Sequence, residues 1–575
     1  MTDSKKKQSI WRRKIKWPRP IAWLFHFIFS PKMLRVYLFA LACCITLIIA
    51  FYTVENIRGS LAWSQHVKEL RAAGISRDFR DYIPPEIPDE ENLAKIPMFA
   101  AFEYERIPSK TKRNLWDHRE VKVKWKDKSW GPLKNLSIYY RTKRNNHLFQ
   151  ALDNAEGRWQ KTEPTDLSQL QVYYRGTNAF DLKWPTPRAK SILENTNIIQ
   201  NWAEATNSFP YPKQPGIPAE DVLIALKKYD SIWEELKTAS QQRKKMRFPL
   251  HYNELFGCLL PHLTHIKSIH RYGKLRATAE LVSGKHQEAT ESIRLMMQIN
   301  NGLRHETFFI SHLVRIANIY FSIHPIWEGI NRHAFKAEDL RTLSSEFENI
   351  HLLAELPKIL RMECSVFAAT MEVMEEHRHT FYRYFGPGTF DEKKWPGYWT
   401  SDSYMNFAPT GWFKQNMLFY SQELRALEHM ISNVIQMKPN AILSFEAHLK
   451  QSLEKPLTTY NVLAKQLYLY KNKESFYKSL TAENTIRIVK TAIALERYFL
   501  EHQKYPKALD LLVPAYLPEI PLNLYNGQVL QYKREQGGRF TLSATGWEDT
   551  ENKDPQGKPM NRANITWSWP PNEME

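Results

Sequence analysis

Five potential metal ligands follow one another at helical spacing near the middle of the chain. They are His251, Glu254, Cys258, His262 and His265. On an unbroken helix this spacing places all five side chains on one face, and these are side-chain types that bind zinc. Pro261 interrupts the series, because proline breaks or kinks a helix. We therefore interpret the five residues as part of a structural helix face and keep a zinc site as the alternative.

The chain contains no familiar catalytic or nucleotide-binding motif. The P-loop, the GxSxG nucleophile elbow, HExxH, CxxC and the dinucleotide GxGxxG fingerprint do not occur. SxxK tetrads at Ser109, Ser452 and Ser475 lack the SDN and KTG elements of acylating serine enzymes. The cluster Glu375–His379 is typical of a solvated helix end. We therefore assign no catalytic residue and no cofactor, and we favour a protein that is not an enzyme.

The net charge of +19 is confined to two segments. Residues 1–35 carry ten Lys and Arg against one Asp, and residues 106–161 carry fifteen against five acids, so the rest is formally neutral. The second segment interleaves its charges with Trp and Tyr, which suits lipid head groups or an anionic envelope polymer. A solvated strand face explains the same residues, and we favour it. We expect no nucleic acid partner.

The first basic segment precedes Val36–Val54, an uncharged stretch of nineteen residues. This is close to the roughly 20 residues that a helix needs to cross a bilayer. A cleaved signal peptide is the alternative, although its apolar core is usually only about 7 to 15 residues long. Because basic residues hold their flank in the cytoplasm, the pattern predicts a single-pass inner-membrane anchor with a cytoplasmic N-terminus and a periplasmic body. Outside the span only Cys258 and Cys364 remain to form a disulfide.

Most of the body has helical periodicity. Apolar residues recur at helical spacing over 219–238, 252–270, 273–283, 286–302, 307–331, 337–349, 353–384, 411–437 and 475–503. Strand alternation is found over Glu120–Lys126, and Leu136–Tyr140 and Gln171–Tyr174 are further candidate strands. Leu275–Gly284 and the Ala-led segment after it resemble one tetratricopeptide-type hairpin without a second copy. We therefore expect an irregular, solenoid-like helical stack.

The C-terminal residues are predicted to form a small module. Thr481 is the expected N-cap of a long helix that ends at Tyr505–Pro506. Strands over Val529–Tyr532 and Arg539–Ser543 then form a hairpin around Gln536–Gly538.

The fold class is therefore mainly α, with an N-terminal transmembrane helix, a helical stack and an α+β end. The predicted segments are a basic cytoplasmic tail (1–35), the transmembrane helix (36–54), a membrane-proximal segment and proline-rich linker (55–98), a small basic β-containing region (99–185), the helical stack (186–384), an aromatic Gly/Pro loop (385–410), a helical region (411–479) and the C-terminal module (480–575).

Five short motifs are spread over the chain after residue 84. They are Phe248–Tyr252, His312–Ala317, Trp327–Gly329, Pro409–Trp412 and Ala494–Tyr498. Together they resemble a family of uncharacterised membrane-anchored proteins from verrucomicrobial-type bacteria. The resemblance implies a Gram-negative envelope and brings no activity, catalytic residue or cofactor with it.

A second resemblance is confined to the C-terminus. It is carried by Leu495–Tyr498, Gln503–Pro506, Leu512–Pro514 and Phe540–Ser543. These motifs resemble the globular end of type II secretion major pseudopilins, in which a long helix packs on a small antiparallel sheet and an acidic loop can bind calcium. The residues in the corresponding loop, and thus the calcium candidates, are Glu548, Asp549, Glu551 and Asp554. Ala563–Ile565 stands where that family has paired Asp before Ile, and the prepilin cleavage signal is missing, so polymerisation is not implied.

These features predict a membrane-anchored periplasmic scaffold or binding protein of the bacterial envelope. Its partners would be the lipid bilayer, through the N-terminal helix, and an envelope protein or anionic polymer. The alternative is an envelope hydrolase acting on a cell-wall or lipid substrate, with catalytic residues that the sequence does not expose.

Overall fold

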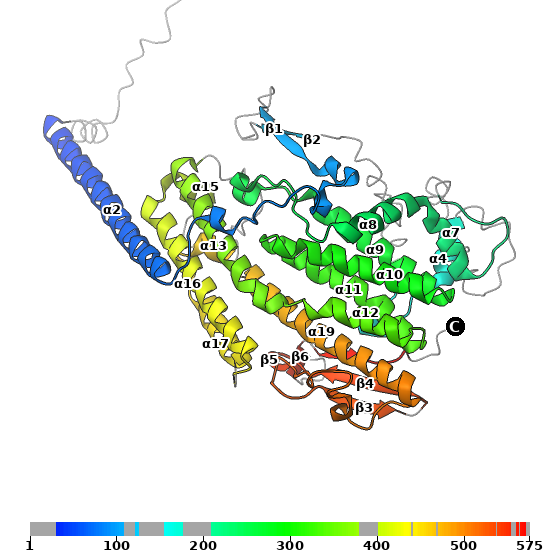
Figure 1. Ribbon diagram of the computed structural model, residues 1–575. Coiled ribbons are helices and arrows are strands. Elements are labelled where there is room, and N and C mark those ends of the chain that lie inside the picture. The colour runs from blue at the N-terminus through cyan, green and yellow to red at the C-terminus, as the bar shows by residue number, and fades with distance from the viewer. Residues whose placement is uncertain are drawn as a thin grey trace, which may run out of the picture.

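The computed structural model describes residues 30–108, 121–125, 155–175, 209–378, 401–438, 441–466, 470–535, 537–553, 559–562 and 564–570. Helices dominate these residues, and a long N-terminal helix projects from the helical body (Figure 1). A continuous core of buried side chains extends from Trp63 to Trp567. The mainly α fold with a small sheet is therefore confirmed, whereas a solenoid-like arrangement is not.

The projecting helix α2 extends over Pro31–Ala72. Ser30 caps it by accepting a hydrogen bond from the amide of Met33 at 3.3 Å, and Pro31 occupies the first turn, where proline is tolerated. At 1.5 Å per residue its 42 residues span about 63 Å. Among the described residues it is the helix long and apolar enough to cross a membrane, and a signal sequence would meet the same criterion.

Seven further helices match the helical periods in the sequence. They are α9 (Pro261–Val282), α10 (His286–Gly302), α11 (Phe309–Asn331), α12 (Ala337–Glu348), α13 (Leu352–Glu376), α16 (Thr410–Ile435) and α19 (Tyr470–His502). Helices α9 and α10 form the predicted hairpin, with Gly284 at a positive φ of 75° in the turn. The sequence predicts two separate helices over 252–270 and 273–283. The structure instead has one helix over Pro261–Val282, which runs through Gly273 without a break.

Six more helices among the described residues have 14 residues or fewer. They are α4 (Leu167–Arg175), α7 (Pro218–Leu226), α8 (Asp230–Gln242), α15 (Ser401–Phe407), α17 (Ala441–Glu454) and α18 (Val462–Ala464). The strand prediction for Gln171–Tyr174 is wrong, because these residues belong to α4 and all of them are buried. A short, fully buried run has no periodicity that separates a strand from a helix.

Three small antiparallel sheets complete the described structure. Strand β1 (Tyr104–Pro108) pairs with β2 (Val121–Trp125), which confirms the strand predicted over Glu120–Lys126. Strands β3 (Gln531–Glu535), β4 (Arg539–Ala544) and β7 (Ile565–Trp567) form the second sheet, and β5 (Trp547–Lys553) pairs with β6 (Pro559–Arg562). The predicted hairpin is confirmed, with Gly537 and Gly538 at positive φ in its turn. Leu136–Tyr140 lies outside the described residues.

Helix α19 joins the C-terminal sheet to the helical body. It packs on β4 and β7 and also on α11, α12 and α13 (Figure 1). The prediction of Thr481 as the N-cap of this helix is wrong. Thr481 lies inside the helix, because the helical pattern continues unbroken back to Tyr470. The hydroxyl of Thr481 accepts a hydrogen bond from Tyr525 at 2.9 Å instead. The predicted boundary at residue 480 thus falls within a continuous helix.

The proline-rich stretch predicted as an extended linker packs against the body. Leu93, Ala94 and Ile96 are buried, and the Asn92 side chain donates to the carbonyl of Arg247 at 2.9 Å. The segment forms short 3-10 helices over Leu93–Lys95 and Pro97–Phe102, and its apolar residues provide surface to bury. The path from α2 into the body is therefore fastened along its length.

Candidate functional site

The five potential metal ligands do not converge. Pro261 begins helix α9, so the helix face from His251 to His265 does not exist, as the proline suggested. The His251 Nε2 atom lies 2.7 Å from the carbonyl oxygen of Tyr104, whereas His262 Nε2 lies 2.9 Å from Glu306 Oε2. The described residues contain no group of three potential metal ligands.

The calcium candidates and the Glu375–His379 cluster belong to two different elements. Glu548, Asp549 and Glu551 lie on strand β5, in the segment that was predicted as an acidic loop, and Asp554 lies outside the described residues. Glu375 and Glu376 end helix α13, and Glu375 Oε1 lies 3.5 Å from Lys414 Nζ. The helix end predicted there is confirmed, with Glu375 engaged in an ion pair.

Two buried histidine pairs resemble catalytic geometry and are closed to any substrate. His312 Nε2 lies 2.9 Å from Ser479 Oγ, but that hydroxyl donates to the carbonyl of Ser475, so the imidazole acts as the donor. His324 Nδ1 accepts from the amide of Trp159 at 3.1 Å, and its Nε2 lies 2.8 Å from Glu328 Oε1. All these groups are buried, and the second pair fastens the segment around Trp159 onto α11.

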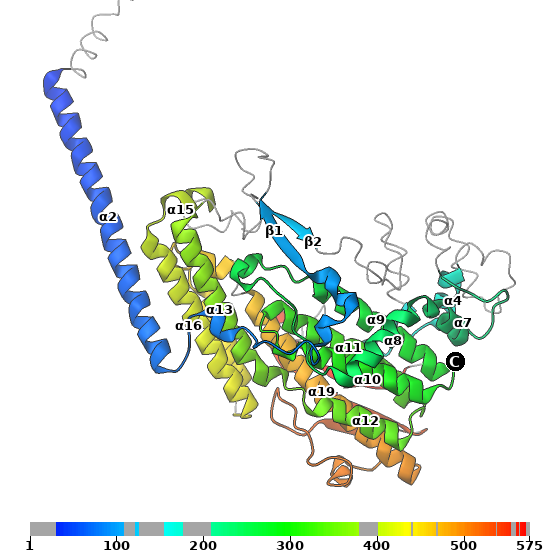
Figure 2. The same ribbon diagram turned by 45° about the horizontal axis from the view of Figure 1, so that its top comes forward.

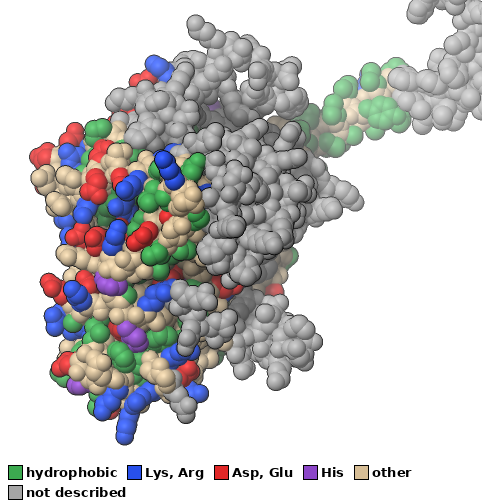
Figure 3. All heavy atoms as spheres, turned by 90° about the vertical axis from the view of Figure 1, so that its right-hand side faces the viewer, with side chains coloured by type: hydrophobic (Ala, Val, Ile, Leu, Met, Phe, Trp, Pro, Cys, Tyr) green, Lys and Arg blue, Asp and Glu red, His purple; other side chains and the backbone are tan. Residues whose placement is uncertain are grey.

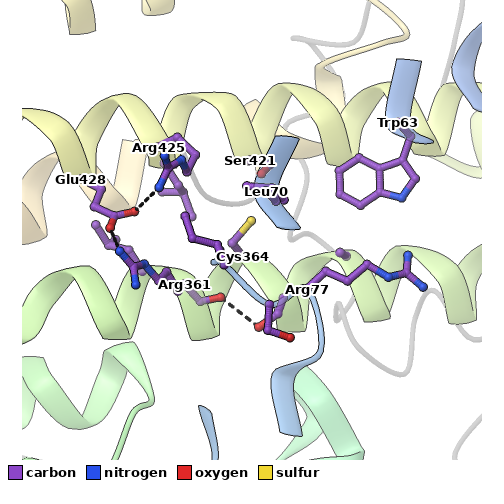
Figure 4. A pocket seen from close by; sticks show the side chains of 14 residues that line it. Trp63, Leu70, Arg77, Arg361, Cys364, Ser421, Arg425 and Glu428 are labelled. Carbon is purple, nitrogen blue, oxygen red and sulfur yellow. Dashed lines mark hydrogen bonds and ion pairs between the residues drawn. The ribbon is translucent and has the colours of Figure 1, made fainter. Parts of the chain in front are cut away.

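A partly open cleft lies where helices α2, α13 and α16 meet (Figure 4). Its apolar floor is formed by Trp63 and Leu70 of α2 with Leu360 and Leu424. The space between these side chains, including the part open to solvent, is about 410 Å³, and its narrow interior has room for about one water molecule. The cleft is therefore a seam between packed helices rather than a ready pocket for a large ligand.

Three arginines surround this cleft and are paired with two acids. Glu428 accepts hydrogen bonds from Arg361 and Arg425, as Figure 4 shows, and Arg77 donates to Glu372 at 2.9 Å. The positive charges are thus largely neutralised within the protein. They tie α13 to α16 and to the segment after α2.

Cys364 and Ser421 also line the cleft, and Ser421 contacts His66, which lies outside the lining. All four cysteines are free thiols, and burial raises the pKa of Cys364 to about 11, so it is protonated at neutral pH. Ser421 Oγ lies 2.8 Å from His66 Nε2, while Glu69 Oε2 is 3.6 Å from Nδ1, beyond hydrogen-bond distance. Burial also lowers the pKa of His66.

The closest approach of α2 and α16 lies at two glycines. A Cβ atom on Gly59 would overlap the backbone of Gly411, and one on Gly411 would overlap the carbonyl of Glu55. Two helix backbones can approach this closely only where both residues are glycine, because any Cβ atom would overlap the facing backbone. The two glycines therefore set the spacing between the N-terminal helix and the body.

Polar bonds flank this glycine crossing. Glu55 accepts from Trp412 Nε1 at 2.8 Å and from Arg58 at 3.0 Å, and the amide of Gly411 donates to Asn56 at 3.0 Å. Sequence reasoning missed this interface. The signal was present in the spacing of the α2 residues that the body buries, which are Glu55, Gly59, Trp63, His66 and Leu70.

No protein-family model, curated protein or solved structure matches this chain. Its function therefore has to be inferred from the geometry of the α2–α16 interface and the surfaces around it.

Proposed function

We propose that the protein is a membrane-tethered scaffold or binding protein of a bacterial envelope, with α2 as its single anchor. One observation carries this proposal. A single helix is apolar and exposed over its first half and packs tightly on α16 over its second half. Such a helix transmits the orientation of the anchor to the body, because no hinge separates the two.

The distribution of exposed apolar side chains supports the anchor. The most apolar 18-residue window of α2 has a mean hydropathy of 2.4 and buries none of its residues in the body. On the face that Figure 3 displays, the described surface instead mixes acidic and basic side chains. An apolar surface of this length needs a covering, and a bilayer supplies it. The ten basic residues before the span favour a cytoplasmic N-terminus and a body on the far, periplasmic side.

Cysteine labelling tests this topology. In intact spheroplasts, an impermeant maleimide should label Glu90→Cys, whose position is exposed in the body, but should label Gln8→Cys only after lysis. The unsubstituted chain gives the background from its native thiols. Labelling of position 8 and protection of position 90 would reverse the proposed orientation.

An envelope hydrolase is the second candidate, favoured by the contact between Ser421 and His66. Two features weigh against it. Ser421 lies in the interior of α16, where backbone amides are engaged in the helix and form no oxyanion hole. The Glu69 carboxylate, at 3.6 Å, is too far to orient the imidazole. We therefore infer a structural role for this pair.

A fluorophosphonate probe separates the two functions without knowledge of a substrate. A serine made nucleophilic by histidine reacts with such a probe, whereas a serine that only bonds a histidine does not. We expect no labelling above that of a Ser421→Ala control, measured by gel fluorescence. Labelling that disappears in the Ala variant would favour the hydrolase.

A further inference from the structure

We propose that the body rests directly on the bilayer, with helix α15 and the start of α16 lying in the head-group region. The inference deepens the proposed anchor function and rests on it. It names lipid as the partner of a particular surface of the body, which we call the α15 edge and define as Ser401–Phe407 with Thr410–Trp412.

The outer face of α2 remains apolar beyond the point where the body begins. Glu55 is the first residue of α2 that the body buries, but Val54, Ile57 and Leu61 are 61%, 55% and 67% exposed on the opposite side. Leu61 lies about 10 Å further along the helix axis than Val54. Ser64 and Lys68 then begin an exposed polar stretch. The apolar environment around α2 therefore extends past the first contacts with the body and ends near Leu61.

The α15 edge lies at the same level of the helix. The Tyr52 hydroxyl donates a hydrogen bond to the carbonyl of Phe407, and the ring of Phe51 meets that of Trp412 edge-on, with centroids 6.1 Å apart. Both ribbon views place α15 beside the middle of α2 (Figures 1 and 2). It lies at the end of α16 that is nearest the exposed N-terminal half of α2. If the bilayer surrounds α2 as far as Ile57 and Leu61, its surface must therefore also contact α15.

The side chains of this region suit a membrane interface. Phe407 is 62% exposed, whereas Tyr404 and Met405 of the same helix are buried. Arg58 lies over the ring of Tyr460, 4.5 Å from its centroid. Aromatic residues and Arg side chains concentrate at the boundary between hydrocarbon and water.

Glu55, the acid that α2 contributes at this level, is neutralised, which lowers the cost of bringing this part of α2 close to lipid. Glu55 is 8% exposed and is satisfied by Arg58 and the Trp412 indole. Lys414 donates to Ser60 at 3.3 Å, within the same interface. An unpaired carboxylate here would oppose contact with a bilayer, whereas a paired one does not.

Depth-dependent quenching in liposomes tests the proposal. The full chain, with its four cysteines replaced by Ala, carries an environment-sensitive fluorophore on one introduced cysteine. Leu47→Cys probes the apolar half of α2, Phe407→Cys probes the α15 edge, and Ile435→Cys is the matched control. Ile435 is exposed and apolar and lies on the same helix α16, at its far end, about 37 Å from Thr410. The contacts Glu55–Trp412 and His66–Ser421 show that α2 and α16 run in the same direction away from the anchor.

We expect a head-group nitroxide lipid to quench position 407 at least about threefold more than position 435, and a mid-chain nitroxide to quench position 47. Quenching at 47 without quenching at 407 would overturn this inference and leave the anchor intact. No quenching at 47 would overturn the anchor and this inference with it. Equal quenching at 407 and 435 would also overturn it, since the body would then have no defined orientation.

A second measurement uses the unmodified chain, in case the cysteine-free variant does not fold. A photoactivatable lipid with its reactive group near the head group should crosslink to residues 401–412 and spare the end of α16 around Ile435. Crosslinks confined to α2 would overturn the proposal.

Discussion

Replacing Gly59 with leucine is expected to detach helix α2 from α16 while the rest of the body stays folded. The Cβ atom alone would overlap the backbone of Gly411, and backbone atoms cannot move aside as a flexible side chain can. Separation of the helices would break the bonds of Glu55 to Trp412 and of Asn56 to Gly411. We expect a loss of at least about 3 kcal/mol in the free energy of docking. Hydrogen exchange in α16 measures it directly.

Ser64→Leu provides the matched control. It adds a similar volume to the same helix, five residues further along, but on the exposed face. This variant should exchange like the wild type, and Gly411→Ala should reproduce the effect of Gly59→Leu from the opposite helix. Unchanged protection of α16 amides in both glycine variants would show that the two backbones do not meet.

Acidification from pH 7 to pH 5 is expected to destabilise the body, and two buried histidines, His312 and His324, account for about 4 kcal/mol of the loss. Burial lowers the pKa of His312 to about 3 and that of His324 to about 4. Unfolded histidines titrate near 6.5, so below that pH the unfolded state binds protons that the folded state does not. Stability is therefore complete above pH 6.5 and declines as the pH falls toward the folded pKa values. Urea titrations of the full chain in detergent measure this slope.

Glutamine variants at these two positions isolate the effect. Glutamine at position 324 can still accept from the Trp159 amide and donate to Glu328, and it does not titrate. Burial raises the pKa of Glu280 and Glu483, which stabilises the fold on acidification and partly offsets the loss in both proteins. His312→Gln with His324→Gln should therefore flatten the decline relative to the wild type. Equal slopes in the two proteins would contradict neutral histidines in the core.

Local sequence patterns predicted most of the helical body and little of its assembly. Long periodic stretches such as 286–302 and 337–349 became helices α10 and α12 with nearly the same bounds. Short, fully buried segments misled the prediction, as at Gln171–Tyr174, because alternation is informative only when one face meets water. The break at Pro261 was predictable, since it depends on one residue's covalent geometry.

The candidate site was not predictable in the same way. His66 and Ser421 are 355 residues apart, and nothing in either neighbourhood marks them as partners. The residues that did stand out by type and spacing, His251 to His265, were divided between a short turn and a helix with separate partners. The role of a histidine, serine or acid depends on the residues around it in the fold, and these come from distant segments of the chain.

The apolar span, its basic flank and the positions of the main helices can be predicted from the amino-acid sequence, because each depends on interactions within a few turns of the chain. That α2 continues from the span into the body and packs on α16, so that the segment after the span is not a free linker, is visible only in the folded chain. That outcome depends on two glycines far apart in the chain, Gly59 and Gly411, whose backbones meet only once the body has folded. Close packing between helices that are far apart in the sequence depends on the complementary shapes of their surfaces, which the periodicity of either helix does not predict.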